Sequence, residues 1–399
     1  MAAARSPAGL RAALRMSAAA AACRYLATGL ALALTGCLLV AAVGILVPVE
    51  QWSIVGLVVM SILPALLVAA LIAVVLAALV SRFRRRLGRS LAVLTVAATV
   101  VITVPLIAQW RTAQAYDAPL SLRQGLAPGL NRGRSEPARS ITYATVGGQD
   151  LELDVWRPAD AGARPRPAIV WLHGGSWSGG ARGAVPKWNE WFTRRGYAVF
   201  DVEYRLEPQP NWRQAPADAA CAVGWVKARA RDYGVDPDRV MVGGLSAGAH
   251  LALQVGYSAG AGPAPSCTVG DTSVSAVIAL YGPTDLVRAW ESSAPKWQRV
   301  LERYLGGTPE EVPGRYHTSS PLTYVRSGLP PTFLVHGERD TVVPHEQMTI
   351  LADALEHADV PHTALSLPYG RHVFDVAWGA FTTQITRHVL GEFLAANLR

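Results

Sequence analysis

The hydrophobic pattern of the chain changes near residue 140, where long apolar stretches give way to short ones. Before that point, residues 26–47, 54–80 and 91–108 contain no Asp, Glu, Lys or Arg. Each stretch is close to or above the roughly 18 to 20 residues that a helix needs to cross a bilayer. Buried core helices are the alternative, but three such stretches would leave no polar face for water. We therefore predict three transmembrane helices within a membrane region at residues 1–110, with a kink at Pro64.

From residue 141 onward, short apolar runs alternate with amphipathic segments. Residues 141–156 alternate around Gly147 and Gly148, as in a β-hairpin. Strands are then expected at 168–172, 198–202, 240–242, 274–280, 332–335 and 363–367, and helices at 187–195, 215–233, 249–257, 345–357 and 376–397. Short buried strands alternating with helices indicate an α/β fold, with a mostly parallel sheet covered by helices on both faces. The active site of such a sheet lies at the carboxyl ends of its strands.

The regions before and after residue 140 also differ in net charge. The chain has a net charge of +8, but its first 140 residues hold 14 Arg, no Lys and three acidic residues, which leaves the remainder slightly acidic. Arginines precede the first apolar stretch and fill the 82–89 loop, so this loop and the N-terminus are predicted to be cytoplasmic. The domain after Trp110 is then extracytoplasmic, although Arg111 and Arg123 on that side weaken the assignment. No nucleic-acid partner is expected.

Residues 111–140 and the four cysteines contain no recognisable catalytic motif. Residues 111–140 lack hydrophobic periodicity and are expected to be a linker to a catalytic domain at 141–399. The four cysteines show no CxxC spacing, so neither a zinc ribbon nor a redox motif is predicted. Nothing else in the sequence requires a metal or an organic cofactor. Cys221 and Cys267 could pair in an oxidising compartment. Nothing in the sequence places them within bonding distance, so two unpaired buried thiols are the favoured interpretation.

The segment 240–250 (VMVGGLSAGAH) predicts a strand, a Gly-x-Ser-x-Gly turn and a helix. A serine on so sharp a turn needs small neighbours, because the flanking strand and helix approach each other closely. Gly244 and Gly248 meet this need. A second match, around Ser258, follows a helix and opens into a loop. Ser246 is therefore the predicted nucleophile.

A glycine-rich segment follows the strand at 168–172. There, His173-Gly174-Gly175 can bring backbone N–H groups close to a developing oxyanion. Together with the N–H of Ala247, Gly174 and Gly175 are predicted to form the oxyanion hole. An ordinary glycine turn would be the better interpretation if this motif stood alone.

The acid and the base are expected after later strands. Asp340 follows the strand at 332–335, where it can orient an imidazole, and Asp285 is the alternative acid. His372 precedes the last helix and can relay the serine proton. His317 and His345 are rival bases, but neither follows a terminal strand. The chain order Ser246, Asp340, His372 is that of α/β-hydrolases.

From about residue 141 to its end, the chain resembles the esterase and lipase branch of the α/β-hydrolases that carries an HGG oxyanion motif. It is most similar to the feruloyl-esterase-like, kynurenine-formamidase-like and hormone-sensitive-lipase-like members. The resemblance rests on eight collinear motifs, namely 173–177 (HGGSW), 203–206 (EYRL), Asp218 with Trp225, 233–237 (YGVDP), 244–248 (GLSAG), 281–285 (YGPTD), 336–340 (HGERD) and 370–372 (GRH). It implies the α/β-hydrolase fold and the same triad and oxyanion donors. The membrane region departs from these commonly soluble relatives.

Together these features predict a membrane-anchored serine hydrolase, carboxylesterase-like or lipase-like, that cleaves carboxylic esters through an acyl-enzyme. A membrane acyltransferase, an amidase or a peptidase would use the same triad. Trp177, Tyr204, Tyr281 and Phe374 are candidate pocket residues, with core packing an equal alternative. The expected partners are a small-molecule or lipid ester and the bilayer. The sequence defines neither the acyl length, the alcohol nor the oligomeric state.

Overall fold

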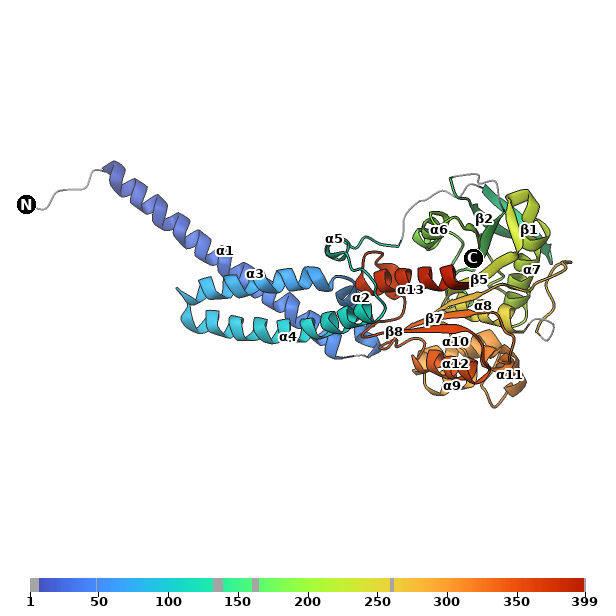
Figure 1. Ribbon diagram of the computed structural model, residues 1–399. Helices are drawn as coiled ribbons and strands as arrows, with labels where there is room; N and C mark the ends of the chain where they lie inside the picture. Colours follow the sequence, from blue (N-terminus) through green and yellow to red (C-terminus); the bar gives the residue numbers. More distant parts are fainter. Residues whose placement is uncertain (1–6, 48, 132–138, 160–164, 259–261, 398–399) are drawn as a thin grey trace, which may run out of the picture.

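The computed structural model describes residues 7–47, 49–131, 139–159, 165–258 and 262–397. Its N-terminal helices project to one side of a globular α/β domain (Figure 1). These helices are α1 Pro7–Leu46, η1 Glu50–Trp52, α2 Ser53–Ser61, α3 Leu63–Ser81, α4 Arg85–Ala115 and α5 Leu122–Leu126.

Three of these helices contain segments long and apolar enough to cross a bilayer, namely Met16–Leu46, Leu63–Ser81 and Arg85–Ala115. The helices α1 and α4 extend well beyond the predicted stretches. The predicted kink near Pro64 is a complete break at Ile62, which leaves the helical conformation with φ −124° and ψ 22°. Proline lacks an N–H and its ring clashes with the carbonyl four residues earlier, so α2 and α3 are separate helices.

Small side chains allow the long helices to pack closely. Ala31, Ala70 and Ala73 are fully buried among them. The hydroxyl groups of Thr35 in α1 and Thr95 in α4 form a buried hydrogen bond of 2.9 Å. Small residues and interhelical hydroxyl contacts are typical of helices associated in a membrane.

The segment expected to be a linker is largely ordered. The helix α4 continues to Ala115, and α5 follows. The N–H of Ser121 donates to Gln384 Oε1 at 2.7 Å, and the N–H of the buried Asn131 donates to the Val376 carbonyl at 2.6 Å. These polar contacts, together with the packing of Ala118 and Leu120 against apolar residues of the α/β domain, hold the segment, and such contacts to distant residues leave no periodic pattern in the sequence. Residues 132–138 of the expected linker lie outside the described residues.

The predicted hairpin and mostly parallel sheet are confirmed. The eight strands are β1 Arg139–Val146, β2 Gln149–Trp156, β3 Arg166–Leu172, β4 Ala198–Val202, β5 Val235–Leu245, β6 Val277–Leu280, β7 Thr332–Gly337 and β8 His362–Leu367. They lie in the order β1-β2-β4-β3-β5-β6-β7-β8. The strands β1 and β2 are antiparallel to their neighbours, and β3 to β8 are parallel.

Helices cover both faces of this sheet. They are α6 Pro186–Thr193, α7 Gln214–Ala228, η2 Ala230–Tyr233, α8 Ala247–Tyr257, α9 Leu286–Glu291, α10 Pro295–Leu305, α11 Pro313–Ser319, η3 Pro321–Tyr324, α12 Glu346–His357, η4 Phe374–Val376 and α13 Phe381–Asn397. One core lies between the sheet and α7, α8 and α12, and the other lies against α6 and α13.

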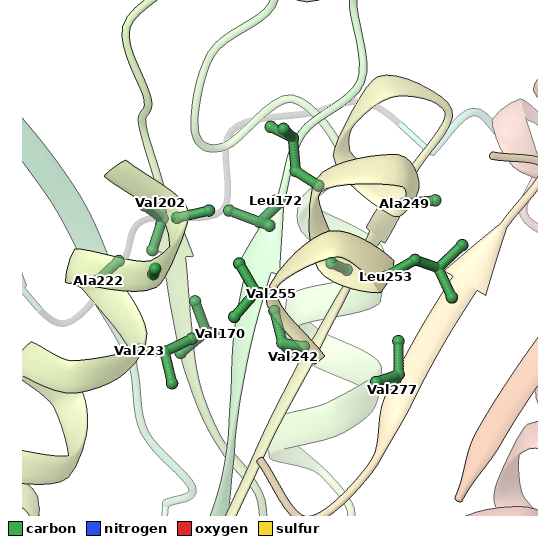
Figure 2. Packing of buried hydrophobic residues seen from close by; sticks show 14 of the residues in the cluster. Val170, Leu172, Val202, Ala222, Val223, Val242, Ala249, Leu253, Val255 and Val277 are labelled. Carbon is green, nitrogen blue, oxygen red and sulfur yellow. The ribbon is translucent and has the colours of Figure 1, made fainter. Parts of the chain in front are cut away.

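The two cores follow from alternation along the strands. In β3, Val170 and Leu172 enter the first core, whereas Ile169 and Trp171 enter the second. Figure 2 shows Val170 and Leu172 packed among side chains of α7 and α8, including Val223 and Val255. Since both faces are buried, β3 is an almost continuous apolar run. The helices α9, α10 and α11, between β6 and β7, were not predicted.

Cys221 and Cys267 form a disulfide with a Cα–Cα distance of 5.5 Å, so the favoured interpretation of unpaired thiols was wrong. Cys221 is fully buried on α7. The chain after α8 returns over α7, where the N–H of Ser266 donates to the Ala217 carbonyl at 3.0 Å. This return brings together two cysteines that are 46 positions apart, and no local pattern indicates it.

Because of this bond, we expect maleimide to label two cysteines in the denatured, unreduced chain and all four after reduction. Reduction should also lower the free energy of unfolding by about 2–4 kcal/mol, since the crosslink restricts the unfolded chain. The control is the double variant Cys23→Ser/Cys37→Ser, which should lose the reduction-independent labels and keep its thermal midpoint. Labelling of four cysteines before reduction would contradict the pairing.

Candidate active site

Ser246 lies on a sharp turn between β5 and α8 at the carboxyl edge of the sheet. Its backbone has φ 52° and ψ −118°, which is strained for a residue with a side chain. A Cβ atom at Gly244 would lie 2.5 Å from the Leu172 carbonyl oxygen, and one at Gly248 would lie 2.2 Å from the same atom. The glycines therefore provide the room that the turn requires.

His372 connects Ser246 to Asp340. In the loop after β8, its Nε2 lies 3.0 Å from Ser246 Oγ, and its Nδ1 lies 2.6 Å from Asp340 Oδ2. The three side chains form one hydrogen-bonded line, although Ser246 and His372 are 126 positions apart. In this arrangement the imidazole can accept the hydroxyl proton while the carboxylate fixes its tautomer.

The rival residues have other contacts. The Ser258 hydroxyl donates to the Gln254 carbonyl, and His345 Nε2 lies 2.9 Å from Ser366 Oγ. His317 lies in the last turn of α11. Asp285 caps α9, because its carboxylate accepts the N–H groups of residues 287 and 288.

The Asp340 carboxylate is fully buried and well supplied with donors. Its Oδ1 accepts the N–H groups of Val342 and Val343 at 2.8 and 3.0 Å, and His336 Nε2 lies 3.2 Å from its Oδ2. Burial alone would raise the pKa of Asp340. His372, His336 and the hydrogen bonds outweigh burial and hold the pKa below its ordinary value, so the side chain is ionised at neutral pH.

The predicted oxyanion donors surround the turn. A Cβ atom at Gly174 would lie 3.4 Å from Ser246 Cβ, so the glycine loop passes directly beside the serine. Gly175 has φ 129°, which favours glycine. Ala247 begins α8. Within the described parts of the chain, the N–H groups of Gly175 and Ala247 form no hydrogen bond.

Tyr204 supports the glycine loop from behind. Its hydroxyl donates to the His173 carbonyl at 2.9 Å, and its ring stacks on the His173 imidazole with centroids 4.4 Å apart. Burial lowers the pKa of His173 to about 4, so the imidazole is neutral and its Nδ1–H can donate to the Gly174 carbonyl. These contacts fix the backbone that carries the candidate donors.

A cavity of about 40 Å³ lies beside Ser246. It is lined by Ser176, Trp177, Ser246, Ala247, Pro283, Ala289, Ser293, Trp297, Val300, Leu301, Val342, Val343 and Pro344. Of the candidate pocket residues, Trp177 lines this cavity, whereas Tyr204, Tyr281 and Phe374 are buried in the domain interior instead. The unpredicted helices α9 and α10 supply four of the lining residues that the sequence did not indicate, namely Ala289, Trp297, Val300 and Leu301.

Tyr281 and Phe374 pack behind the histidine. The Tyr281 ring lies edge-on to His372 with centroids 4.8 Å apart, and Phe374 packs against Tyr281. The Tyr281 hydroxyl donates to Asp375 Oδ1 at 2.6 Å, and Trp188 Nε1 donates to Asp375 Oδ2 at 2.7 Å. Burial raises the pKa of Asp375. This network holds Tyr281 in place and thereby restricts the side of the His372 ring that faces Tyr281.

Two arginines attach the loops of the acid and the base to the end of α1. Arg371 Nη2 donates to the Gly44 carbonyl at 2.7 Å, and Arg339 Nη1 donates to the Ile45 carbonyl. These arginines immediately precede His372 and Asp340. Carbonyls at a helix C-terminus lack intrahelical partners, so guanidinium groups are favourable there.

Packing makes this contact tight. Arg371 is 2% exposed, and a Cβ atom at Gly56 of α2 would lie 2.5 Å from its guanidinium carbon. Nearby, the Thr341 hydroxyl lies 3.2 Å from that of Ser53. Hence the last turn of α1 and the first half of α2 directly touch the loops that hold Asp340 and His372.

The sheet order and the serine, histidine and aspartate aligned at its carboxyl edge define an α/β-hydrolase. Residues 153–355, just over half of the chain, match the BD-FAE family, and the chain belongs to this family of α/β-hydrolase esterases. The resemblance drawn from the motifs is thereby confirmed. Among the described residues, no group of three or more His, Cys, Asp and Glu side chains is arranged to hold a metal ion.

Named relatives agree with this family. Esterase LipQ of Mycobacterium tuberculosis is 32% identical over 67% of this chain and 64% of its own length, and esterase LipC of the same organism is 32% identical over 61% of each. The chain thus spans less than two thirds of these relatives. Among solved structures, the propionate-bound esterase 2 of Thermogutta terrifontis is 29% identical in sequence and has a TM-score of 0.55. The match covers 65% of this chain and 94% of the Thermogutta chain.

The contact between Gly56 and Arg371 gives a testable expectation. Gly56→Val should displace the guanidinium and shift His372, and so lower the rate at which a fluorophosphonate labels Ser246 by about ten- to a hundred-fold. Gly29→Val is the matched control, because nothing lies within 4 Å of a Cβ atom there. Equal labelling rates in the two variants, measured in detergent, would contradict a role for this contact in positioning the site.

Proposed function

We propose that the protein is a membrane-anchored serine esterase that cleaves carboxylic esters through an acyl-enzyme. The hydrogen-bonded line from Ser246 through His372 to Asp340, with distances of 3.0 and 2.6 Å, carries this proposal. Membership of the BD-FAE family and the relatives named esterases support the reaction class.

The reaction begins when Ser246 Oγ attacks the ester carbonyl and His372 Nε2 takes the hydroxyl proton. The tetrahedral oxyanion accepts hydrogen bonds from the N–H groups of Gly174, Gly175 and Ala247. When the carbon–oxygen bond breaks, His372 gives its proton to the departing alcohol. His372 then takes a proton from a water molecule, which attacks the acyl-enzyme. When the bond between the acyl carbon and Ser246 Oγ breaks, His372 returns the proton to Ser246 and the carboxylic acid is released. The ionised Asp340 stabilises the imidazolium in both halves.

The catalytic domain at residues 141–399 is proposed to face the extracytoplasmic side, with the N-terminus in the cytoplasm. Arginines before the first span and in the 82–89 loop support this orientation. The Cys221–Cys267 disulfide supports it independently, because such bonds persist in oxidising compartments.

Ser246→Ala should abolish labelling by a fluorophosphonate and lower the turnover of p-nitrophenyl acetate by roughly three orders of magnitude or more, since the nucleophile is lost. Ser258→Ala is the control, because it removes the serine of the second Gly-x-Ser-x-Gly match and should keep near-normal turnover. Labelling that persists in Ser246→Ala would reject the assignment.

Asp340→Asn should lower kcat by up to about ten-thousand-fold, because an amide cannot stabilise the imidazolium or hold its tautomer. Asp285→Asn should change kcat only a few-fold, because asparagine still caps a helix. Steady-state kinetics with p-nitrophenyl acetate compares the two variants. Near-normal kcat in Asp340→Asn together with a large loss in Asp285→Asn would reverse the choice of acid.

A further inference from the structure

The carboxyl edge of the sheet contacts the helices that are long enough to span a bilayer. Ser246, Asp340 and His372 follow the parallel strands β5, β7 and β8, so all three lie at this edge. At the same edge, Arg339 and Arg371 bind the last turn of α1. In Figure 1 the long helices extend from the globular domain on the side where β8 and α2 lie.

Cationic side chains mark both boundaries of the apolar part of α1. At one end, the guanidinium of Arg24 lies 5.8 Å from the Phe83 ring centroid, beside the arginine-rich segment 82–89, where α3 has ended and α4 begins. At the other end, Arg371 binds the Gly44 carbonyl. The two ends are about 20 residues apart, or roughly 30 Å of helix, which matches the thickness of the hydrocarbon core. Since guanidinium groups avoid that core, we place its outer boundary near Gly44.

The candidate active site therefore lies at the bilayer surface. His372 is the residue after Arg371, and Val373, which follows it, is 38% exposed. Around the outer end of α1, the apolar side chains of Leu46, Ile54 and Val58 are also exposed, Ile54 by 77%. Apolar side chains at this level have lipid rather than water as their favourable surroundings.

The cavity beside Ser246 is too small for a long chain. At about 40 Å³ it holds only a few non-hydrogen atoms. Its wall is rigid on one side, where Trp177 stacks on the fully buried Tyr304 with centroids 4.2 Å apart. From α10, Trp297 and Leu301 close other sides. An ester that reacts here must therefore have one compact part inside the cavity and a second part outside it.

We propose that the substrate is an ester of a short acyl group and a lipophilic alcohol that resides in the outer leaflet of the bilayer. This inference rests on the proposed esterase function and names its substrate class. The acyl group stays bonded to Ser246 inside the cavity, while the alcohol takes the proton from His372 and returns to the bilayer. Water then releases the short carboxylic acid and regenerates the serine. The acyl group is the part that stays bonded to Ser246, and Ser246 itself lines the cavity, so the compact part is the acyl group and the part that extends into the lipid is the alcohol.

Two isomeric esters test this assignment in the full chain reconstituted into vesicles of ether-linked phosphatidylcholine, which carry no competing ester. Hexadecyl acetate and ethyl hexadecanoate have the same formula and similar hydrophobicity, but they carry the long chain on opposite sides. We expect hexadecyl acetate to be hydrolysed at least about ten-fold faster, with a rate that follows its mole fraction in the bilayer. Equal or faster hydrolysis of ethyl hexadecanoate overturns the inference.

Water-soluble esters distinguish a failure of the proposed lipid substrate from a failure of the proposed esterase function. Cleavage of ethyl acetate or p-nitrophenyl acetate without cleavage of hexadecyl acetate overturns the lipid substrate and leaves the esterase function standing. Failure to cleave any ester overturns both.

Trp297→Ala should enlarge the cavity and reduce the preference between the isomers by at least roughly five-fold. Trp290→Ala is the control, because Trp290 binds Glu302 and does not line the cavity, and it should keep the wild-type ratio. An unchanged ratio in Trp297→Ala contradicts the placement of the acyl group in this cavity.

Discussion

Two guanidinium groups bound to the last carbonyls of α1 connect the apolar helices to the candidate active site. Arg339 and Arg371 neighbour Asp340 and His372 in sequence, so the geometry of the acid and the base depends on how the arginines are held. This arrangement exploits the unpaired carbonyls that every helix has at its C-terminus. The apolar N-terminal helices thereby do more than lie beside the α/β domain, because α1 and α2 form part of the support for the site.

The site itself combines strain, burial and charge. Gly244 and Gly248 allow Ser246 to adopt a backbone conformation that would otherwise clash with β3. The Asp340 carboxylate is buried, yet backbone N–H groups and two imidazoles keep it ionised. Leaving a buried carboxylate without such partners would be costly, so the loop after β7 and the loop after β8 must both be in place. The contact with α1 fixes both loops at once.

Sequence patterns predicted the elements that depend on local signals. Alternation around Gly147 and Gly148 gave the hairpin, and the glycines around Ser246 gave the turn. The places of Asp340 and His372 followed from the strands before them, because parallel strands end at one edge. The roles of these residues in catalysis stay predictions.

Features that depend on distant contacts could not be predicted from such patterns. Arg371 and its partner Gly44 are 327 positions apart, and Arg339 and Ile45 are 294 apart. The disulfide and the polar contacts of residues 111–131 likewise depend on how separate segments meet. The helices α9 and α10, between β6 and β7, supply part of the cavity wall, and no pattern in the sequence predicted them. Aromatic residue type alone did not separate Trp177, which lines the cavity, from Tyr204 and Tyr281, which support the loops.

An experimental structure of the full chain in a lipid nanodisc, solved after reaction with a fluorophosphonate, tests the central claim most directly. The account predicts phosphorus bonded to Ser246 Oγ, a phosphonyl oxygen accepting hydrogen bonds from the glycine loop and Ala247, and Arg339 and Arg371 at the lipid boundary on the end of α1. Phosphorus on another residue, or a carboxyl edge of the sheet that faces away from the bilayer, would contradict it.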